Sequence, residues 1–143
     1  MGQELGRLAR PGDILLLTGQ LGAGKTCLTQ GIARGLGVEG YATSPTFVVM
    51  NQYQGRLIMY HIDLYRIDTL AEVMDLGLDD YLYGDGVCVV EWADKALEAF
   101  PAERLLVEMG FTSDTSRSVT FHPTGDRYKT LLSHFDRGVK KVG

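Results

Sequence analysis

Residues 19–26, GQLGAGKT, have the spacing of a loop that binds phosphate groups. They match G-x-x-x-x-G-K-[ST] at every specified position. Glycines let successive backbone N–H groups turn toward phosphate oxygens, and a helix that begins at the loop directs the positive end of its dipole to the same place. In such a loop Lys25 reaches the β- and γ-phosphates, and the Thr26 hydroxyl ligates Mg²⁺. The pattern therefore predicts a site for a nucleoside triphosphate and Mg²⁺.

A phosphate loop also needs an acid on the metal side, at the end of a neighbouring buried strand. Glu91 has this place, because it directly follows the apolar run Val87–Val90. Asp63 ends another apolar segment, where it would orient the attacking water or bind the metal through water. The alternatives are an ordinary surface glutamate at 91 and a solvated charge at 63. His61 lies in a strand pattern by itself, which favours a packing residue over a ligand.

The tetrapeptide SPTF, residues 44–47, lies between the first helix and the next strands. Proteins with phosphate loops place a segment that senses the γ-phosphate at about this point of the chain. We therefore expect a switch loop here, with a rigid turn as the alternative.

The elements that must position these residues alternate between strand and helix patterns. A short apolar run, residues 13–18, predicts a buried strand before the loop, and Leu28, Ile32 and Leu36 recur at helical spacing in residues 24–36 after it. We expect a hairpin of two strands at residues 46–53 and 56–62, followed by a short helix at 70–76. A buried strand is expected at 87–90, two further strands at 105–109 and 118–121, and a last helix at 126–135. This order predicts an α/β fold, a P-loop NTPase-like three-layer sandwich with a mixed parallel and antiparallel sheet.

The composition agrees with a single globular domain over residues 1–143, with 45% hydrophobic and 22% charged residues. Fourteen basic and eighteen acidic residues give a net charge of −4, which argues against direct binding of nucleic acid.

The strictly apolar runs are far shorter than the roughly 20 residues that span a membrane. Because Cys27 and Cys88 have no metal-binding spacing, we expect two buried, unreactive thiols in a cytoplasmic protein.

Several motifs occur together in this order: LTGQLGAGKT, SPTF, YHIDLYR and VVEWADK, at residues 17–26, 44–47, 60–66 and 89–95. With the segment at residues 72–82, they closely resemble the TsaE (YjeE) family of small bacterial P-loop ATPases. The phosphate loop alone is shared with many unrelated proteins, but this succession of motifs in one short chain is specific. The resemblance covers roughly residues 4–110.

The resemblance implies a role in making threonylcarbamoyladenosine next to the anticodon of tRNAs. A family member binds a TsaB–TsaD pair, and its ATP hydrolysis supports repeated turnover of that complex, so tRNA contact is only indirect. Carried over by position, phosphate is held by Gly22, Ala23, Gly24, Lys25, Thr26 and Cys27, and Mg²⁺ by Thr26 and Glu91. Lys25, Asp63 and Thr46 of the SPTF loop belong to the catalytic and switch apparatus, and Trp92 follows the metal-binding glutamate.

One departure concerns the first residues, because family members usually have a longer segment before the part that matches residues 4–6. For this reason the resemblance does not assign the residues that contact adenine. Two other functions compete with the ATPase: a small nucleotide or metabolite kinase, and a nucleotide-gated binding module without hydrolysis. The kinase needs a lid rich in arginine, and only Arg56 and Arg66 lie between Ser44 and Glu91. A GTPase is disfavoured because the chain has no N-K-x-D motif.

Overall fold

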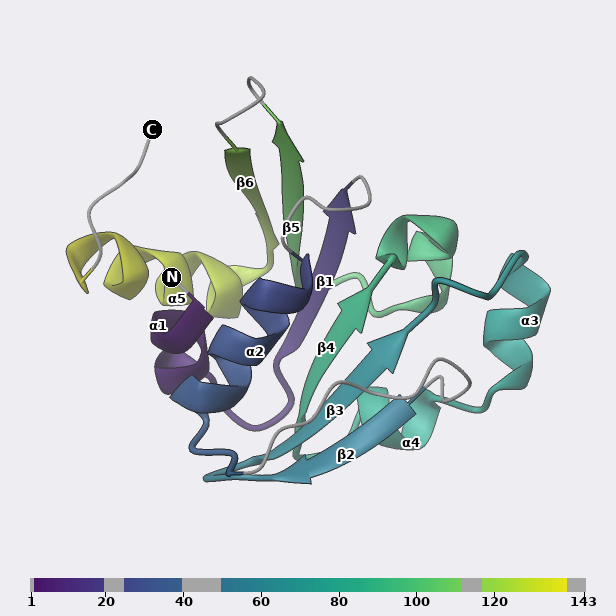
Figure 1. Ribbon diagram of the computed structural model, residues 1–143, viewed down its shortest axis with the longest axis horizontal. Helices are drawn as coiled ribbons and strands as arrows, with labels where there is room; N and C mark the ends of the chain where they lie inside the picture. Colours follow the sequence, from purple (N-terminus) through teal and green to yellow (C-terminus); the bar gives the residue numbers. More distant parts are fainter. Residues whose placement is uncertain (1, 20–24, 40–49, 112–116, 139–143) are drawn as a thin grey trace.

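A computed structural model describes residues 2–19, 25–39, 50–111 and 117–138. Six strands form one sheet in the order β2-β3-β4-β1-β5-β6 (Figure 1). The four central strands are parallel, and the two edge strands run antiparallel to their neighbours. From edge to edge they are β2 (Met50–Gln54), β3 (Ile58–Asp63), β4 (Val87–Glu91), β1 (Ile14–Gly19), β5 (Arg104–Phe111) and β6 (Arg117–Thr124). The prediction of a mixed sheet in an α/β fold is confirmed.

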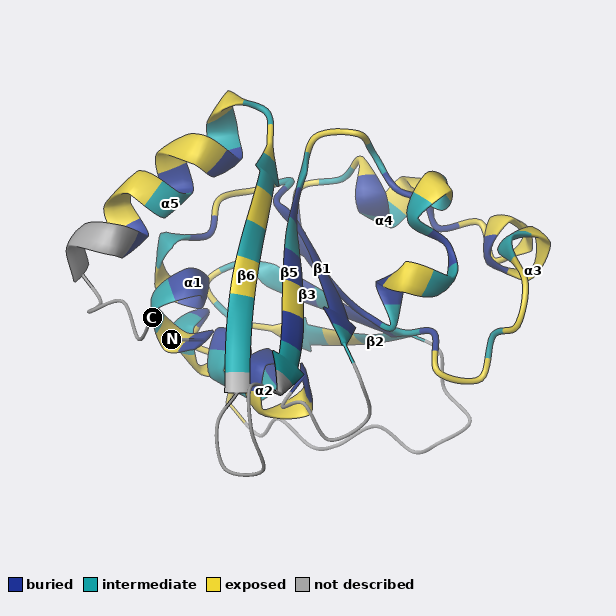
Figure 2. Cartoon of the chain, turned by 90° about the horizontal axis from the view of Figure 1, so that it is seen from above, coloured by how far each residue is buried: buried dark blue, intermediate teal, exposed yellow. Residues whose placement is uncertain are grey.

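Helices cover both faces of the sheet and make three layers, as Figure 2 shows. One face packs against α1 (Gly2–Leu8), α2 (Lys25–Gly35) and α5 (Asp126–Gly138). The other packs against α3 (Leu70–Asp75), α4 (Asp79–Leu82) and two short 3₁₀ turns, η1 (Ala93–Lys95) and η2 (Leu97–Ala99). The three-layer arrangement predicted from the sequence is therefore also confirmed.

Strand β1 is buried between these two layers, which explains its run of apolar residues. Leu15 and Leu17 point into the core with α1, α2 and α5, whereas Ile14 and Leu16 point into the opposite core. All four are at most 3% exposed. Because a fully buried leucine or isoleucine contributes roughly 1.5–3 kcal/mol, the strand is firmly fixed between the layers. This fixes the position of Gly19, where the phosphate loop begins.

Helix α1 was not expected from the sequence, and it packs against α2 through glycines. A Cβ added at Gly6 would lie 2.2 Å from the carbonyl oxygen of Ile32, and one at Gly35 would lie 2.1 Å from that of Gln3. The two helices can approach this closely only because neither position has a side chain. Glycine in a helix is about 1 kcal/mol less favourable than alanine. The residues that allow the contact therefore also explain why the sequence does not predict this helix.

The other predicted elements agree with the structure within a few residues at each end, apart from residues 24 and 46–49, which lie outside the described residues. Helix α4 was not predicted as an element.

The expectation of two buried thiols is wrong for Cys27, which is exposed near the start of α2, and correct for Cys88 on β4. Burial raises the pKa of the Cys88 thiol to about 12. No helix within the described ranges is long and apolar enough to cross a membrane.

Candidate active site

The candidate site lies where three parallel strands end and α2 begins. In the register of the sheet, Glu91 of β4 lies between Leu17 of β1 and Asp63 of β3. Alternation along a strand places Asp63 and Glu91 on the face that packs against α2, together with Met59, Val87 and Val89. Ligands of open α/β sheets bind outside these carboxyl ends. The fold therefore brings residues that are far apart in the sequence to one edge.

The Glu91 carboxylate contacts two other side chains of the site. Its Oε1 accepts a hydrogen bond from the Thr26 hydroxyl at 3.3 Å. Its Oε2 lies 2.5 Å from Nε2 of His61. His61 and Glu91 are 5% and 4% exposed. A hydroxyl and a carboxylate oxygen are donors that Mg²⁺ prefers, and Mg²⁺ in nucleotide sites takes only one or two protein oxygens beside phosphates and water. The Thr26 and Glu91 pair fits that ion.

Lys25 is buried at the first residue of α2, with its ammonium directed at the end of β1. Nζ donates a hydrogen bond to the carbonyl oxygen of Gly19 at 2.7 Å and lies 3.9 Å from the ring centroid of Trp92. Burial lowers the pKa of Lys25, and the nearby carboxylates of Glu91, Asp94 and Asp63 partly oppose this shift. A cation in this setting gains from an anionic ligand that replaces lost hydration. The geometry suits a phosphate group near Lys25.

Trp92 has a backbone conformation that brings its ring over Lys25. It is the only non-glycine residue with positive φ in the described ranges, at φ 60° and ψ 35°. Such a conformation costs a non-glycine residue of order 1–3 kcal/mol and persists where its surroundings enforce it. The indole packs against Tyr65, with ring centroids 5.2 Å apart. The strained residue directly follows Glu91 in the chain, and its ring contacts Lys25, so it lies between these two side chains.

Asp63 is half-buried at the end of β3, and its Oδ1 accepts a hydrogen bond from the backbone N–H of Tyr65 at 3.0 Å. The chain after Asp63 is held by Lys95 of η1, whose Nζ donates to the carbonyl oxygens of Tyr65 at 2.5 Å and Ile67 at 3.0 Å. The N–H of Leu64 also donates to the carbonyl oxygen of Glu91 at 3.1 Å. The segments that follow β3 and β4 are thus tied together at the site.

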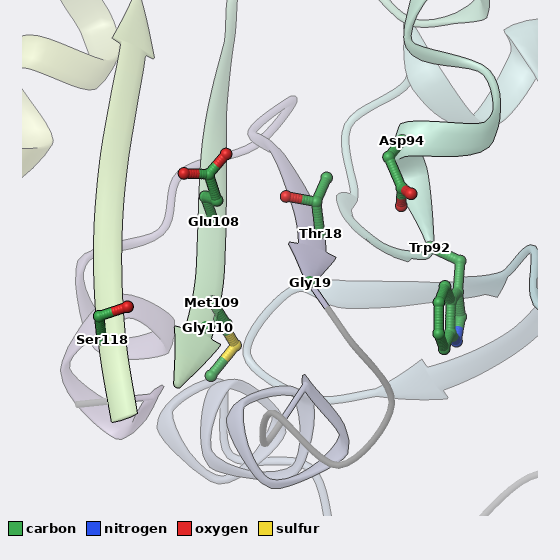
Figure 3. A pocket seen from close by; sticks show the side chains of 8 residues that line it. All are labelled: Thr18, Gly19, Trp92, Asp94, Glu108, Met109, Gly110 and Ser118. Carbon is green, nitrogen blue, oxygen red and sulfur yellow. The ribbon is translucent and has the colours of Figure 1, made fainter. Parts of the chain in front are cut away.

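A cavity of about 590 Å³ adjoins Gly19 at the end of β1 (Figure 3). It is lined by residues of β1, β5, β6 and the start of η1: Thr18, Gly19, Trp92, Asp94, Glu108, Met109, Gly110 and Ser118. Its volume is in the range of small-molecule sites. Trp92 lines this cavity and also lies over Nζ of Lys25, so the cavity adjoins the lysine.

The structure brings together the predicted residues Lys25, Thr26, Asp63 and Glu91. Gly22, Ala23, Gly24 and Thr46 lie outside the described residues, and Cys27 is exposed on α2 one residue beyond Thr26. His61 was expected to be a packing residue. It is indeed buried, but its ring also contacts Glu91, a relation that local sequence pattern does not reveal. The sequence did show that His61 lies two residues before Asp63, so both side chains share one face of the strand near the site.

Comparisons with known proteins agree on one family. A model described as threonylcarbamoyl adenosine biosynthesis protein TsaE matches residues 1–136. A tRNA threonylcarbamoyladenosine biosynthesis protein TsaE from Bacillus subtilis is 46% identical over 130 residues, covering 90% of this chain and 81% of the relative. The protein of the same description from Streptomyces coelicolor is 41% identical over 138 residues, covering 91% and 93%. The crystal structure of YdiB from Bacillus subtilis superposes with a TM-score of 0.80 at 41% identity, covering 95% of this chain and 84% of that one.

Proposed function

The chain belongs to the TsaE family of threonylcarbamoyl adenosine biosynthesis proteins, and from this premise we propose that it binds and hydrolyses ATP with Mg²⁺ to support turnover of a TsaB–TsaD complex. In this function the chain is an energy-supplying subunit, and tRNA contact belongs to the complex. The family role in tRNA threonylcarbamoyladenosine biosynthesis is common to the relatives named above.

One observation carries the proposal: an ammonium, a hydroxyl and a carboxylate from two separate segments meet at the end of β1. Lys25 and Thr26 come from the phosphate-loop signature, and Glu91 comes from β4, 65 residues beyond Thr26. A chance match to the signature would not require a carboxylate within hydrogen-bond distance of its threonine. The grouping therefore supports a site for phosphates with a divalent cation.

Each described side chain has a part in this proposal. Lys25 exchanges its contact with Gly19 for phosphate oxygens and stabilises the charge that develops on the γ-phosphoryl group. Thr26 and Glu91 would hold Mg²⁺, which neutralises phosphate charge when bound. Asp63 lies beside Glu91 in the register and accepts or orients the proton of the attacking water. Trp92 lies over Nζ of Lys25 and packs against Tyr65, so it helps to position the lysine.

The most direct test compares phosphate release by the chain with and without a TsaB–TsaD pair. We expect slow hydrolysis by the chain alone and faster hydrolysis with the pair, since a stabilising arginine supplied by a partner contributes roughly 10³–10⁵ in rate in P-loop enzymes. Fast hydrolysis that ignores the pair would point to a free-standing ATPase. Binding of ATP without any hydrolysis in either case would instead favour the nucleotide-gated module.

Asp63→Asn tests the assigned role of this carboxylate. A group that acts on the proton of the attacking water contributes roughly 10²–10⁴ in rate and little to ground-state binding. We expect the stimulated rate to fall by at least about 100-fold while ATP affinity stays within about twofold. Asp75→Asn, an exposed aspartate of α3, is the matched control and should leave both quantities unchanged. An equal fall in both variants would contradict the assignment.

Trp92 offers an optical measurement of the same site, because it is the only tryptophan of the chain and its ring lies 3.9 Å from Nζ of Lys25. When phosphate draws the ammonium away from the indole, the emission spectrum should change. Titration with Mg²⁺ and ATP, compared with calorimetry on the same sample, measures this. An unchanged spectrum at saturating ATP would place the nucleotide away from Trp92.

A further inference from the structure

His61 and Glu91 form a buried pair, and the proposed function gives a part to Glu91 but none to His61. Both side chains are about 95% removed from solvent, and Nε2 of His61 lies 2.5 Å from Oε2 of Glu91. Glu91 directs its other oxygen, Oε1, to the Thr26 hydroxyl. One carboxylate thus contacts a histidine on one side and the threonine expected to ligate Mg²⁺ on the other.

The sheet dictates this contact. His61 pairs with Val89 in the parallel register of β3 and β4, and Glu91 lies two residues further along the same face. His61 therefore reaches Glu91 diagonally, from a strand that is fixed on both sides by β2 and β4. A histidine on so rigid an element can hold a carboxylate in one orientation.

We propose that His61 is a positioning residue for Glu91: its Nε2 holds Oε2, so that Oε1 stays directed toward Thr26 and the metal side of the site. This inference rests on the proposed function. Without His61, the buried carboxylate would lose its partner at Oε2 and turn toward other donors. Groups that orient a metal ligand in this manner typically account for 10–100-fold in metal affinity.

The use of Nε2 gives the inference a specific signature. A glutamine at position 61 carries its amide nitrogen at a similar distance from the backbone and can donate to Oε2. An asparagine carries its nitrogen one bond closer to the backbone, and a leucine has no donor. His61→Gln should therefore retain the function of His61, whereas His61→Asn and His61→Leu should lose it. A purely structural role would instead rank the variants by packing, with leucine the best tolerated.

The experiment measures two dissociation constants by calorimetry, for ATP with a chelator present and for ATP with saturating Mn²⁺ as the probe ion. We expect His61→Leu and His61→Asn to weaken binding with Mn²⁺ by about 10–100-fold and to leave binding with chelator within about twofold. His61→Gln should stay within a few-fold of the unaltered chain in both. His122→Leu, an exposed histidine of β6, should change neither constant.

Circular dichroism and thermal unfolding establish that each variant is folded before it is titrated. The inference is overturned if folded His61→Leu binds ATP with Mn²⁺ as tightly as the unaltered chain, or if His61→Gln is no better than His61→Asn. Failure of the unaltered chain to bind ATP under either condition would overturn the proposed function, and the role of His61 with it. Normal ATP binding by that chain together with unchanged Mn²⁺ dependence in His61→Leu would overturn only the role of His61.

Discussion

The two ends of β1 both bury charged side chains, but they do so in different ways. At the amino end, Asp13 is 2% exposed and accepts hydrogen bonds from Arg127 at 3.0 and 2.7 Å and from the backbone N–H of Arg10 at 2.9 Å. Next to it, the Tyr128 hydroxyl accepts a hydrogen bond from the N–H of Ile14 at 2.8 Å. These polar groups satisfy one another within the fold.

At the carboxyl end, one buried ammonium lies near three carboxylates, and two of these, Glu91 and Asp63, also accept hydrogen bonds from other groups. Burial disfavours the charge of Lys25, and Glu91, Asp94 and Asp63 only partly restore it. Its contacts with Gly19 and Trp92 can be exchanged for contacts with a ligand. Burial alone therefore does not separate structural from functional charges. We expect them to differ in whether the contacts of the group can be exchanged for contacts with a ligand.

This comparison predicts its largest effect on stability at the amino end. Arg127→Met leaves the Asp13 carboxylate buried without its ionic partner, and breaking a buried pair in this manner typically costs about 3–5 kcal/mol. Because the Arg127 side chain is 21% exposed, we expect the free energy of unfolding to fall by about 3 kcal/mol. Urea unfolding measures the change, and ATP affinity of the folded variant should stay the same.

Arg7→Met is the matched control for this variant, since Arg7 pairs with Glu4 on the surface of α1 and is 69% exposed. An exposed pair contributes at most about 1 kcal/mol, so the control should lose little. Equal losses in Arg127→Met and Arg7→Met would mean that the Asp13 pair is no more important to the fold than a surface contact.

The carboxyl end should respond in the opposite sense to loss of its buried cation. Lys25→Met keeps the length of the side chain and removes the charge, so the free energy of unfolding should stay the same or rise. ATP affinity should fall about 10–100-fold, because hydrogen bonds to charged groups contribute roughly 1.5–3 kcal/mol. Calorimetry and urea unfolding on one preparation give both quantities. Lys129→Met, on the exposed side of α5, should alter neither.

A loss of stability in Lys25→Met as large as that in Arg127→Met would erase the difference between the two ends. Unchanged ATP affinity in the same variant would refute the assignment of the phosphate loop itself.

Sequence reasoning succeeded where one segment contains the whole signal. The apolar runs of β1 and β4 are buried on both faces, so their type follows from local composition. Lys25, Thr26 and Glu91 were predicted as site residues because a loop signature and a strand end specify their places, and the fold brings them together. The geometry that joins them depends instead on pairing between distant segments. The contact of His61 with Glu91 follows from the register of β3 and β4.

Helix α1 and the conformation of Trp92 show two further reasons for the difference. The glycines of α1 oppose helix formation locally and are favoured by a partner helix that only the fold supplies. Trp92 adopts a positive φ that its residue type disfavours, so propensity predicts the wrong backbone. Cys27 is exposed although cysteines are usually buried, because it lies in the first turn of α2 on the side away from the core.

The smallest expected effect concerns Tyr128 and depends on pH. Tyr128→Phe removes the acceptor of the Ile14 N–H, which should cost about 1 kcal/mol at neutral pH and leave ATP affinity unchanged. Burial raises the pKa of Tyr128 to about 12, whereas the same side chain ionises near pH 10 in the unfolded chain. Between these values the unfolded state loses the proton and the folded state keeps it, so stability falls as the pH rises.

The size of this alkaline loss follows from linkage: a difference of two pH units in pKa corresponds to about 2–3 kcal/mol once the pH exceeds both values. Urea unfolding at about pH 8 and about pH 11 should show a smaller decline for Tyr128→Phe than for the unaltered chain. The pKa of Cys88 is also raised, and this thiol contributes to the loss of stability at high pH in both proteins. The free energy of unfolding should therefore still decline with pH in Tyr128→Phe, but less steeply than in the unaltered chain. Parallel curves would mean that Tyr128 ionises equally well in the folded state, and the amino end of β1 would then be less closed to solvent than its hydrogen bonds imply.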